Sequence, residues 1–278
     1  MTRTFLISLA VACGCVVGVP HLCGAGVPLS LHPDNPHYFL FRGKPAVLIT
    51  SGEHYGAVLN LDFDYVAYLD ELAAHRFNHT RLFSGTYCER EDSFGITDNT
   101  LAPARGRFIC PWARSQTPGA FDGGNKFDLT RWDERYFVRL KDFVREAGRR
   151  GIVVEMNLFC TMYSEALWQS SPMHTTNNVN GIGRVGPYDV YSLKEEALTK
   201  AQEAVTRKIV QELSSFDNLY YEVCNEPYER GGMHADWQPR IVEVILETEK
   251  QLPSKHLISL NDGNRTSKIK RTHPAVSI

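Results

Sequence analysis

The sequence predicts an α/β protein of the (β/α)8 barrel type, with about six of the eight strands present. Short apolar runs typical of buried parallel strands alternate with amphipathic segments of helical period. This alternation implies parallel strands joined by right-handed crossovers, and so many units favour a barrel over an open sheet. No glycine-rich phosphate loop follows the first strand, which weakens the dinucleotide-binding alternative.

Composition favours one large domain with a neutral ligand. The 278 residues are 43% hydrophobic, enough for one sizeable core. Lys and Arg total 30 against 32 for Asp and Glu, and no basic run is interleaved with aromatic residues, so a nucleic-acid partner is unsupported. The 10 histidines include no HExxH or similar pair, so we expect no metal site, and no cofactor is indicated.

Residues 1–25 are predicted to be a signal peptide. Arg3 supplies the positive start, and the apolar stretch of residues 5–19 is too short to indicate a membrane span. With cleavage near Ala25, we expect a secreted or periplasmic protein with no membrane span in the mature chain. Lipid attachment at Cys13 is the less favoured alternative, because very little hydrophobic sequence would precede that cysteine.

Four cysteines follow the predicted leader, and their spacing matches no zinc pattern. An exported protein permits disulfides, and Cys88 with Cys110 is the favoured bridge because both fall in one long loop. Cys160 and Cys224 end candidate strands. There, two buried thiols and a disulfide are equally compatible with the sequence.

Strands are expected in order along the chain. Residues 26–45 are predicted to close the base of the barrel, with a short hairpin in residues 38–45 turned at Arg42 and Gly43. Residues 46–278 then form the partial barrel. Its strands are expected at residues 46–50, 77–83, 151–159, 218–224, 256–260 and, as a shorter run, 275–278.

Helices are expected between these strands. Residues 62–76 carry apolar side chains at helical spacing, with Asp62 suited to the start. Residues 131–149 give a clearer pattern, in which Thr130 with Asp133 resembles a capping box. Further helices are expected at about residues 193–216 and 237–252.

Loop lengths indicate which face of the barrel is functional. The segments that follow strands are long, at residues 84–129, 161–192 and 225–236, whereas segments that follow helices are as short as residues 149–151. In β/α barrels the loops after the strands build the active face, and long connections are usually functional. The sequence therefore predicts the site at that rim.

The stretch 218–227, NLYYEVCNEP, carries the strongest functional signal. An apolar, β-branched and aromatic run ends abruptly in Asn225, Glu226 and Pro227. A carboxylate where a strand leaves the core lies at the mouth of a pocket, and burial raises its pKa towards neutrality. Glu226 is therefore the predicted catalytic acid; the alternative is an ordinary charge at the start of the next helix.

With NEP at the end of the predicted fourth strand, the chain resembles the clan A glycoside hydrolases. These are TIM-barrel retaining enzymes that include family five cellulases and mannanases, and the nearer resemblance is to secreted bacterial cellulase-like barrels of the apiosidase type. It runs from about Leu31 to the C-terminus and is carried by GKPAVLITSGEHYG, DYVAYLDELAAHRFNHTRLF, WDERYFVRLKDFVREAGRRGIVVEMNLF and YYEVCNEP.

The resemblance implies roles for three residues. Glu226 matches the general acid/base, and Asn225 matches the neighbour that hydrogen-bonds the sugar 2-hydroxyl. Arg81, at the end of the second strand, matches the arginine beneath the catalytic carboxylates. The alternative for Arg81 is a surface-facing charge on the strand.

Other polar residues at strand ends point to the same mouth and are candidate substrate-binding groups. They are Glu53 and His54 after the first strand, Asn157 late in the third, and Asn261 and Asp262 after the fifth. The alternative for each is a rim hydrogen-bonding group or a solvated loop residue. Glu155 lies within an apolar strand and is predicted to be a structural partner for a buried arginine such as Arg81.

Three aromatic residues in the predicted rim loops are candidates for stacking on sugar rings. They are Trp112, Trp168 and Tyr228. Aromatic faces pack well against the apolar faces of pyranoses. The alternative is that these side chains only fix the loops in place.

The predicted mechanism lacks one component. Retaining glycosidases need two carboxyl groups about 5–5.5 Å apart. The resemblance places the nucleophilic glutamate at the end of the seventh strand, yet no glutamate follows Glu249. We consider a truncated product, a glycan-binding pseudoenzyme, or an enzyme that recruits a carboxylate such as Glu53 or Asp262, and we favour truncation.

The expected function is therefore a secreted glycoside hydrolase that acts on a β-linked poly- or oligosaccharide. Two alternatives stay open. One is a non-catalytic carbohydrate-binding barrel, and the other is a barrel fragment that is inactive because the nucleophile strand is absent.

Overall fold

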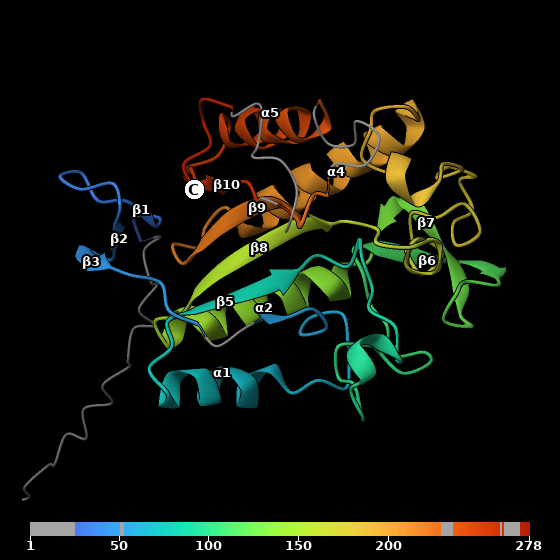
Figure 1. Ribbon diagram of the computed structural model, residues 1–278, viewed down its shortest axis with the longest axis horizontal. Coiled ribbons are helices and arrows are strands. Elements are labelled where there is room, and N and C mark those ends of the chain that lie inside the picture. The colour runs from blue at the N-terminus through green and yellow to red at the C-terminus, as the bar shows by residue number, and fades with distance from the viewer. Residues whose placement is uncertain (1–25, 51–52, 229–235, 262, 264–272) are drawn as a thin grey trace, which may run out of the picture.

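The computed structural model describes residues 26–50, 53–228, 236–261, 263 and 273–278. In this part of the chain, the central sheet has five parallel strands in the order β10-β9-β8-β5-β4 (Figure 1). Their bounds are β4 Glu53–His54, β5 His79–Phe83, β8 Val153–Cys160, β9 Leu219–Asn225 and β10 Ile258–Ser259. The strands lie side by side in chain order, which agrees with the predicted succession of β/α units. The predicted signal peptide lies outside the described residues.

Strands β8 and β9 show the pattern expected of buried parallel strands. Every residue of β8 and β9 is buried. Parallel strands covered on both faces require a nearly continuous apolar run, and both segments have one. Because the polar residues in these runs are few, each must find a partner inside the protein.

Helices cover the sheet and close its core. They are α1 Tyr65–Ala74, α2 Glu134–Arg149, α4 Glu196–Leu213 and α5 Trp237–Glu249, with a short α3 Glu165–Trp168 and 3-10 turns at Ser93–Gly95 and Pro187–Asp189. In Figure 1, α2 lies against β8 and α5 against β9. None of the helices in the described residues is long and apolar enough for a transmembrane span.

Two predicted helix starts need correction. The side chain of Asp64, not that of Asp62, caps α1 by accepting a 3.0 Å hydrogen bond from the Ala67 amide. Asp133 alone caps α2, accepting from the Arg135 amide at 3.1 Å. Thr130 belongs to a strand instead, so the predicted capping box does not form.

The N-terminal hairpin is confirmed. It consists of β2 Phe39–Phe41 and β3 Lys44–Ala46, and β1 Ser30–Leu31 pairs with β2 as a third strand. Arg42 and Gly43 have φ values of 49° and 76°, as tight two-residue hairpin turns require. The Arg42 guanidinium donates to Asp217 Oδ2 at 2.7 Å and to the Gly148 carbonyl at 2.9 Å, which ties the hairpin to the amino-terminal side of the sheet.

The first and last predicted barrel strands are wrong in detail. Residues 47–50 form no strand, because the Asn78 side chain bonds the Val47 carbonyl and the Ile49 amide, at 2.9 and 2.7 Å. The sheet strand is β4, further along the chain. Residues 275–278 are not a strand either, although the Ser277 amide donates to the Ile258 carbonyl at 2.9 Å.

The long segment after β5 contains structure that the sequence analysis missed. Strands β6 Trp112–Pro118 and β7 Asn125–Trp132 pair antiparallel within it. The predicted bridge between Cys88 and Cys110 is also wrong, because both are free, buried thiols. Burial raises the pKa of each well above that of an exposed thiol.

Candidate active site

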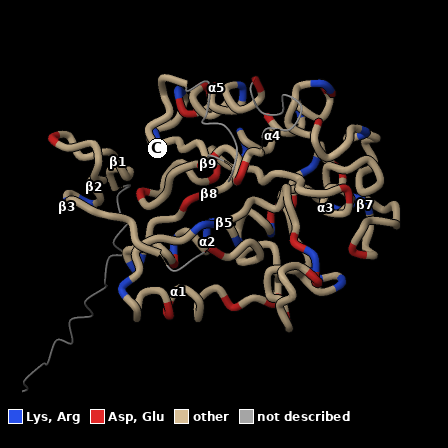
Figure 2. The backbone as a smooth tube through the Cα atoms, viewed as in Figure 1, with Lys and Arg blue, Asp and Glu red and all other residues tan. Residues whose placement is uncertain are grey.

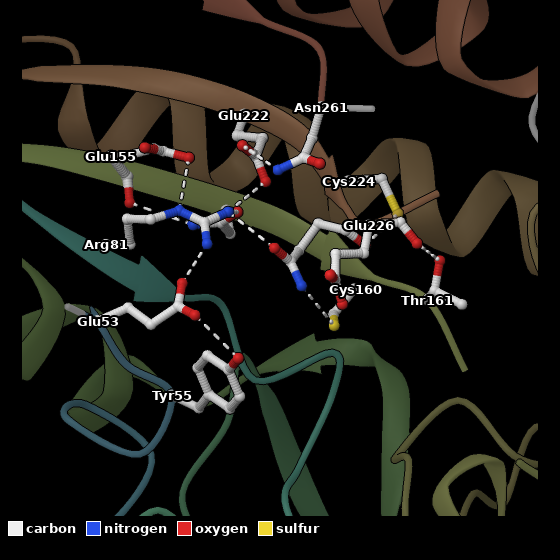
Figure 3. A network of polar contacts seen from close by, with 12 residues as sticks. Glu53, Tyr55, Arg81, Glu155, Cys160, Thr161, Glu222, Cys224, Glu226 and Asn261 are labelled. Atoms are coloured by element: carbon white, nitrogen blue, oxygen red, sulfur yellow. Dashed lines mark hydrogen bonds and ion pairs between the residues drawn. The ribbon is translucent and has the colours of Figure 1, made fainter. Parts of the chain in front are cut away.

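Arg81, in the middle of β5, is the centre of a polar cluster that spans the sheet (Figure 3). Its guanidinium donates to Glu155 at 2.9 Å and to Glu222 at 2.7 Å, and it also pairs with Glu53. Charged residues consequently lie on the central strands as well as on the outer helices (Figure 2). A planar guanidinium with several N–H donors suits such a multiple acceptor site.

Strand register brings these groups together. Glu53 and Glu155 are the backbone partners of Arg81 on the two neighbouring strands, and Asn157 is the partner of Glu222. The Asn157 side chain accepts from Arg81 at 3.1 Å. The prediction that Glu155 is a structural partner of Arg81 is confirmed.

The cluster contains three carboxylates and one guanidinium, so its protonation matters. Burial and the adjacent Glu155 raise the pKa of Glu222 well above its usual value. Glu155 is also buried, yet its hydrogen bonds with His79 and Glu222 and the charge of Arg81 hold its pKa well below the usual value. We therefore assign an ionised Glu155 and a protonated Glu222.

The sequence analysis did not identify Glu222, although its place in an apolar run indicated a buried carboxyl. It interrupts the apolar run of β9 as Glu155 interrupts that of β8. A buried carboxyl in such a run must be paired or protonated. The reasoning that identified Glu155 would also have identified Glu222.

This assignment predicts the pH dependence of a Glu222→Gln variant. The pKa of Glu222 in the folded state exceeds its unfolded value of about 4.3, so its contribution to stability is complete below that pH and is lost as pH rises towards the folded pKa. Glutamine cannot ionise, so we expect the variant to gain stability relative to the parent as pH rises. Urea unfolding from about pH 5 to 8 measures this difference. A difference that is constant with pH would contradict the assignment.

Glu226 follows β9 directly, and its backbone has a φ of 43°. This left-handed conformation is uncommon for a residue with a side chain and clusters at functional sites. The Thr161 hydroxyl donates to the Glu226 carbonyl at 2.6 Å, which helps to hold the turn. The Glu226 side chain is partly exposed and accepts a 2.9 Å hydrogen bond from Tyr163 at Oε2.

Asn225 connects Glu226 to the arginine cluster. Its Oδ1 accepts from Arg81 at 2.8 Å, and its Nδ2 donates to the Tyr163 hydroxyl at 3.1 Å. Asn225 is only 2% exposed and is held by Arg81, so its hydrogen bond orients the Tyr163 hydroxyl. Burial, with the neighbouring Cys160 and Glu226, raises the pKa of Tyr163, which keeps the hydroxyl protonated as a donor to Glu226. The sequence analysis did not identify Tyr163, which lies just beyond β8.

The remaining polar candidates lie in different environments. Glu53 borders the cluster with 26% of its side chain exposed and accepts from the Tyr55 hydroxyl at 2.9 Å. Asn157 is fully buried beneath Arg81. Asn261 donates to Glu222 at 3.2 Å, whereas Asp262 lies outside the described residues.

His54 does not join the cluster. Its ring stacks on Phe63 with centroids 3.7 Å apart, and its Nε2 lies 3.0 Å from the Thr100 hydroxyl. Burial lowers the pKa of His54 to about 4, so the imidazole is neutral at pH 7. The prediction of a substrate-binding group at His54 is not supported by this buried position.

The aromatic predictions divide in the same way. Trp112 and Trp168 are fully buried in this structure, so neither indole presents a ring face at the surface. Tyr228 remains partly exposed and lies 5.9 Å from Tyr163, centroid to centroid. Tyr163 in turn lies 6.1 Å from Tyr87. Tyr87, Tyr163 and Tyr228 therefore form a series of ring contacts beside Glu226.

Comparisons with known proteins identify the fold. A domain family of unknown function, DUF6298, matches residues 103–214, and no curated protein matches the sequence. A candidate glycoside hydrolase from Bacteroides vulgatus is similar to 87% of this chain with a TM-score of 0.58 and 16% identity. A family 5 mannosidase from Rhizomucor miehei is similar to 88% with a TM-score of 0.52 and 15% identity.

The fold of the chain is similar to that of these glycoside hydrolases. The aligned region covers 40% of the Bacteroides vulgatus chain and 58% of the mannosidase. The predicted α/β class with a parallel sheet is confirmed at this level. In a glycoside hydrolase fold of parallel strands, the carboxyl end of the sheet is the expected place for a site, and Glu226 lies at that end.

Proposed function

We propose that this protein is a glycoside hydrolase that acts on a β-linked poly- or oligosaccharide with retention, and that Glu226 is its general acid/base. The observation that carries the proposal is the position of the Glu226 carboxyl. It lies immediately after β9, partly exposed, and is hydrogen-bonded to a tyrosine that the arginine cluster orients.

The contacts of Glu226 suit proton transfer. Tyr163 donates to one oxygen of the Glu226 carboxyl, Oε2, and so orients the group that passes a proton to the departing glycosidic oxygen. The carboxylate formed in that step can then take a proton from the attacking water. Tyr163 fixes the orientation of the Glu226 carboxyl in both steps. Its own hydroxyl is held in place by Asn225, which Arg81 holds in turn.

A second carboxylate must meet the sugar in a retaining reaction. Glu155 and Glu222 are buried around Arg81, whereas Glu53 is partly exposed beside it. Among the described carboxylates of the cluster, Glu53 is therefore the best placed to face a substrate. Because one structural neighbour is a mannosidase, β-mannosides are the first substrates to examine, followed by β-glucosides.

The experiment is hydrolysis of aryl β-mannoside, aryl β-glucoside and β-linked oligosaccharides by the purified protein. We expect release of the aryl group and, by proton NMR at early times, a product with the β configuration of the substrate. Binding of oligosaccharides without cleavage would favour the carbohydrate-binding alternative. Absence of both binding and cleavage across these substrates would contradict the proposal.

A further inference from the structure

A cavity of about 710 Å³ lies beside the candidate site and does not include Glu226 among its lining residues. It is lined by residues 88–92 and 120–123, together with Ala102, Pro103, Arg105, Phe108 and Ser170. Its volume lies in the range of small-molecule sites, about 300–1,000 Å³. The segments that form it belong mainly to the long connection after β5, so this connection builds a chamber of its own.

Glu89 is the distinctive residue in this cavity. Its side chain is buried, with 5% of the residue exposed, and its carboxylate accepts a 2.8 Å hydrogen bond from the Tyr87 hydroxyl. Among the described residues, no cation lies within ion-pair distance of Glu89. Burying an ionised carboxylate without a counterion is costly.

Two aspartates in the same wall have cationic partners. Asp122 pairs with Arg114, and Asp92 pairs with Arg90. Glu89 therefore differs from these two aspartates in having acceptor capacity that no cation among the described residues satisfies, and it differs from the exposed Glu91 in being buried. A ligand with hydroxyl donors would supply the missing hydrogen bonds, and such bonds to a charged acceptor are among the stronger ones.

The cavity adjoins the candidate acid through two tyrosines. Tyr87 donates to Glu89, and Tyr163 donates to Glu226. The two rings meet edge to face with centroids 6.1 Å apart. Glu89 and Glu226 thus accept hydrogen bonds from the two members of one tyrosine pair.

We propose that this cavity is a subsite for a neutral pyranose unit remote from the cleaved bond, with Glu89 as its specificity-determining acceptor. Phe121, which lines the cavity and packs edge to face on Phe108 at 5.4 Å, supplies an apolar surface for the ring. Arg105 in the same wall offers N–H donors that sugar hydroxyl oxygens can accept. This proposal rests on the proposed glycosidase function, which supplies the class of ligand.

The test compares binding in a Glu226→Gln background, where turnover is suppressed. Titration calorimetry with β-1,4-linked mannohexaose and cellohexaose is carried out with and without Glu89→Gln. We expect Glu89→Gln to weaken binding of at least one hexasaccharide about tenfold or more. Glu91→Gln is the matched control, because Glu91 lines the same cavity but is exposed, and its effect should stay within about twofold.

A second readout separates binding from structure. Since Glu89→Gln removes an uncompensated buried charge, the melting temperature of the variant should equal or exceed that of its parent. A lower melting temperature, equal hexasaccharide affinities, or no hexasaccharide binding by any variant would overturn the subsite. If the wild-type protein cleaves nothing but hexasaccharide binding still depends on Glu89, the proposed function fails while the subsite stands.

Discussion

Replacing Glu226 by glutamine is expected to reduce kcat for natural β-linked oligosaccharides by about 10²–10⁴-fold, the usual contribution of a positioned general acid or base. Glutamine preserves the hydrogen bond that Tyr163 donates at 2.9 Å but cannot transfer a proton. Folding should be unaffected, since the side chain is partly exposed and keeps its shape.

The dependence on the leaving group makes this result diagnostic. An aryl glycoside with a very acidic phenol needs little protonation as it departs, so the glycosylation step should be impaired much less for that substrate than for an oligosaccharide. Glu165→Gln, a change at an exposed glutamate of α3 near the same rim, is the control and should leave kcat unchanged. Equal losses for both kinds of substrate would argue against proton donation by Glu226.

Replacing Arg81 by methionine is expected to lower the free energy of unfolding by about 3–5 kcal/mol, as when one partner of a buried ion pair is removed. Glu53, Glu155 and Glu222 would all lose their shared cation. Asn157 and Asn225 would lose a donor as well. Urea unfolding at neutral pH measures the effect.

The matched control is Arg42→Met. Arg42 also pairs with an aspartate, but 45% of its side chain is exposed, so its ion pair should contribute at most about 1 kcal/mol. The deficit of the Arg81 variant should shrink as pH falls, because carboxyls left without a cation have raised pKa values and are stabilising when protonated. A deficit that grows on acidification, or one equal to that of Arg42→Met, would contradict the role given to Arg81.

Residues whose position follows from strand period were predictable. The Glu226 carboxylate directly follows β9, and the strand pattern places Arg81 and Glu155 in the interior. The hairpin turn at Arg42 and Gly43 was also evident, because local turn chemistry determines it. These features depend on short stretches of chain, so one sequence is enough to specify them.

Residues placed by long connections were not predictable. Trp112 was expected at the rim but begins β6, whose pairing with β7 buries the indole. Tyr163 and Tyr87 come from segments far apart in the sequence, and only the folded loops bring their rings together. The hydrophobic period of one strand carries no information on contacts between loops that are distant in the sequence. The tyrosine pair and the Glu89 cavity are therefore seen only in the structure.

The buried thiols described above also provide an intrinsic reporter of motion. Cys160 lies behind the Asn225 side chain and Cys88 beside the Glu89 chamber, and burial raises the pKa of Cys160 to about 12. A maleimide therefore reacts with these sulfurs only when that region opens to solvent. Labelling rates mapped by peptide mass spectrometry would show whether the candidate site opens independently of the sheet beneath it.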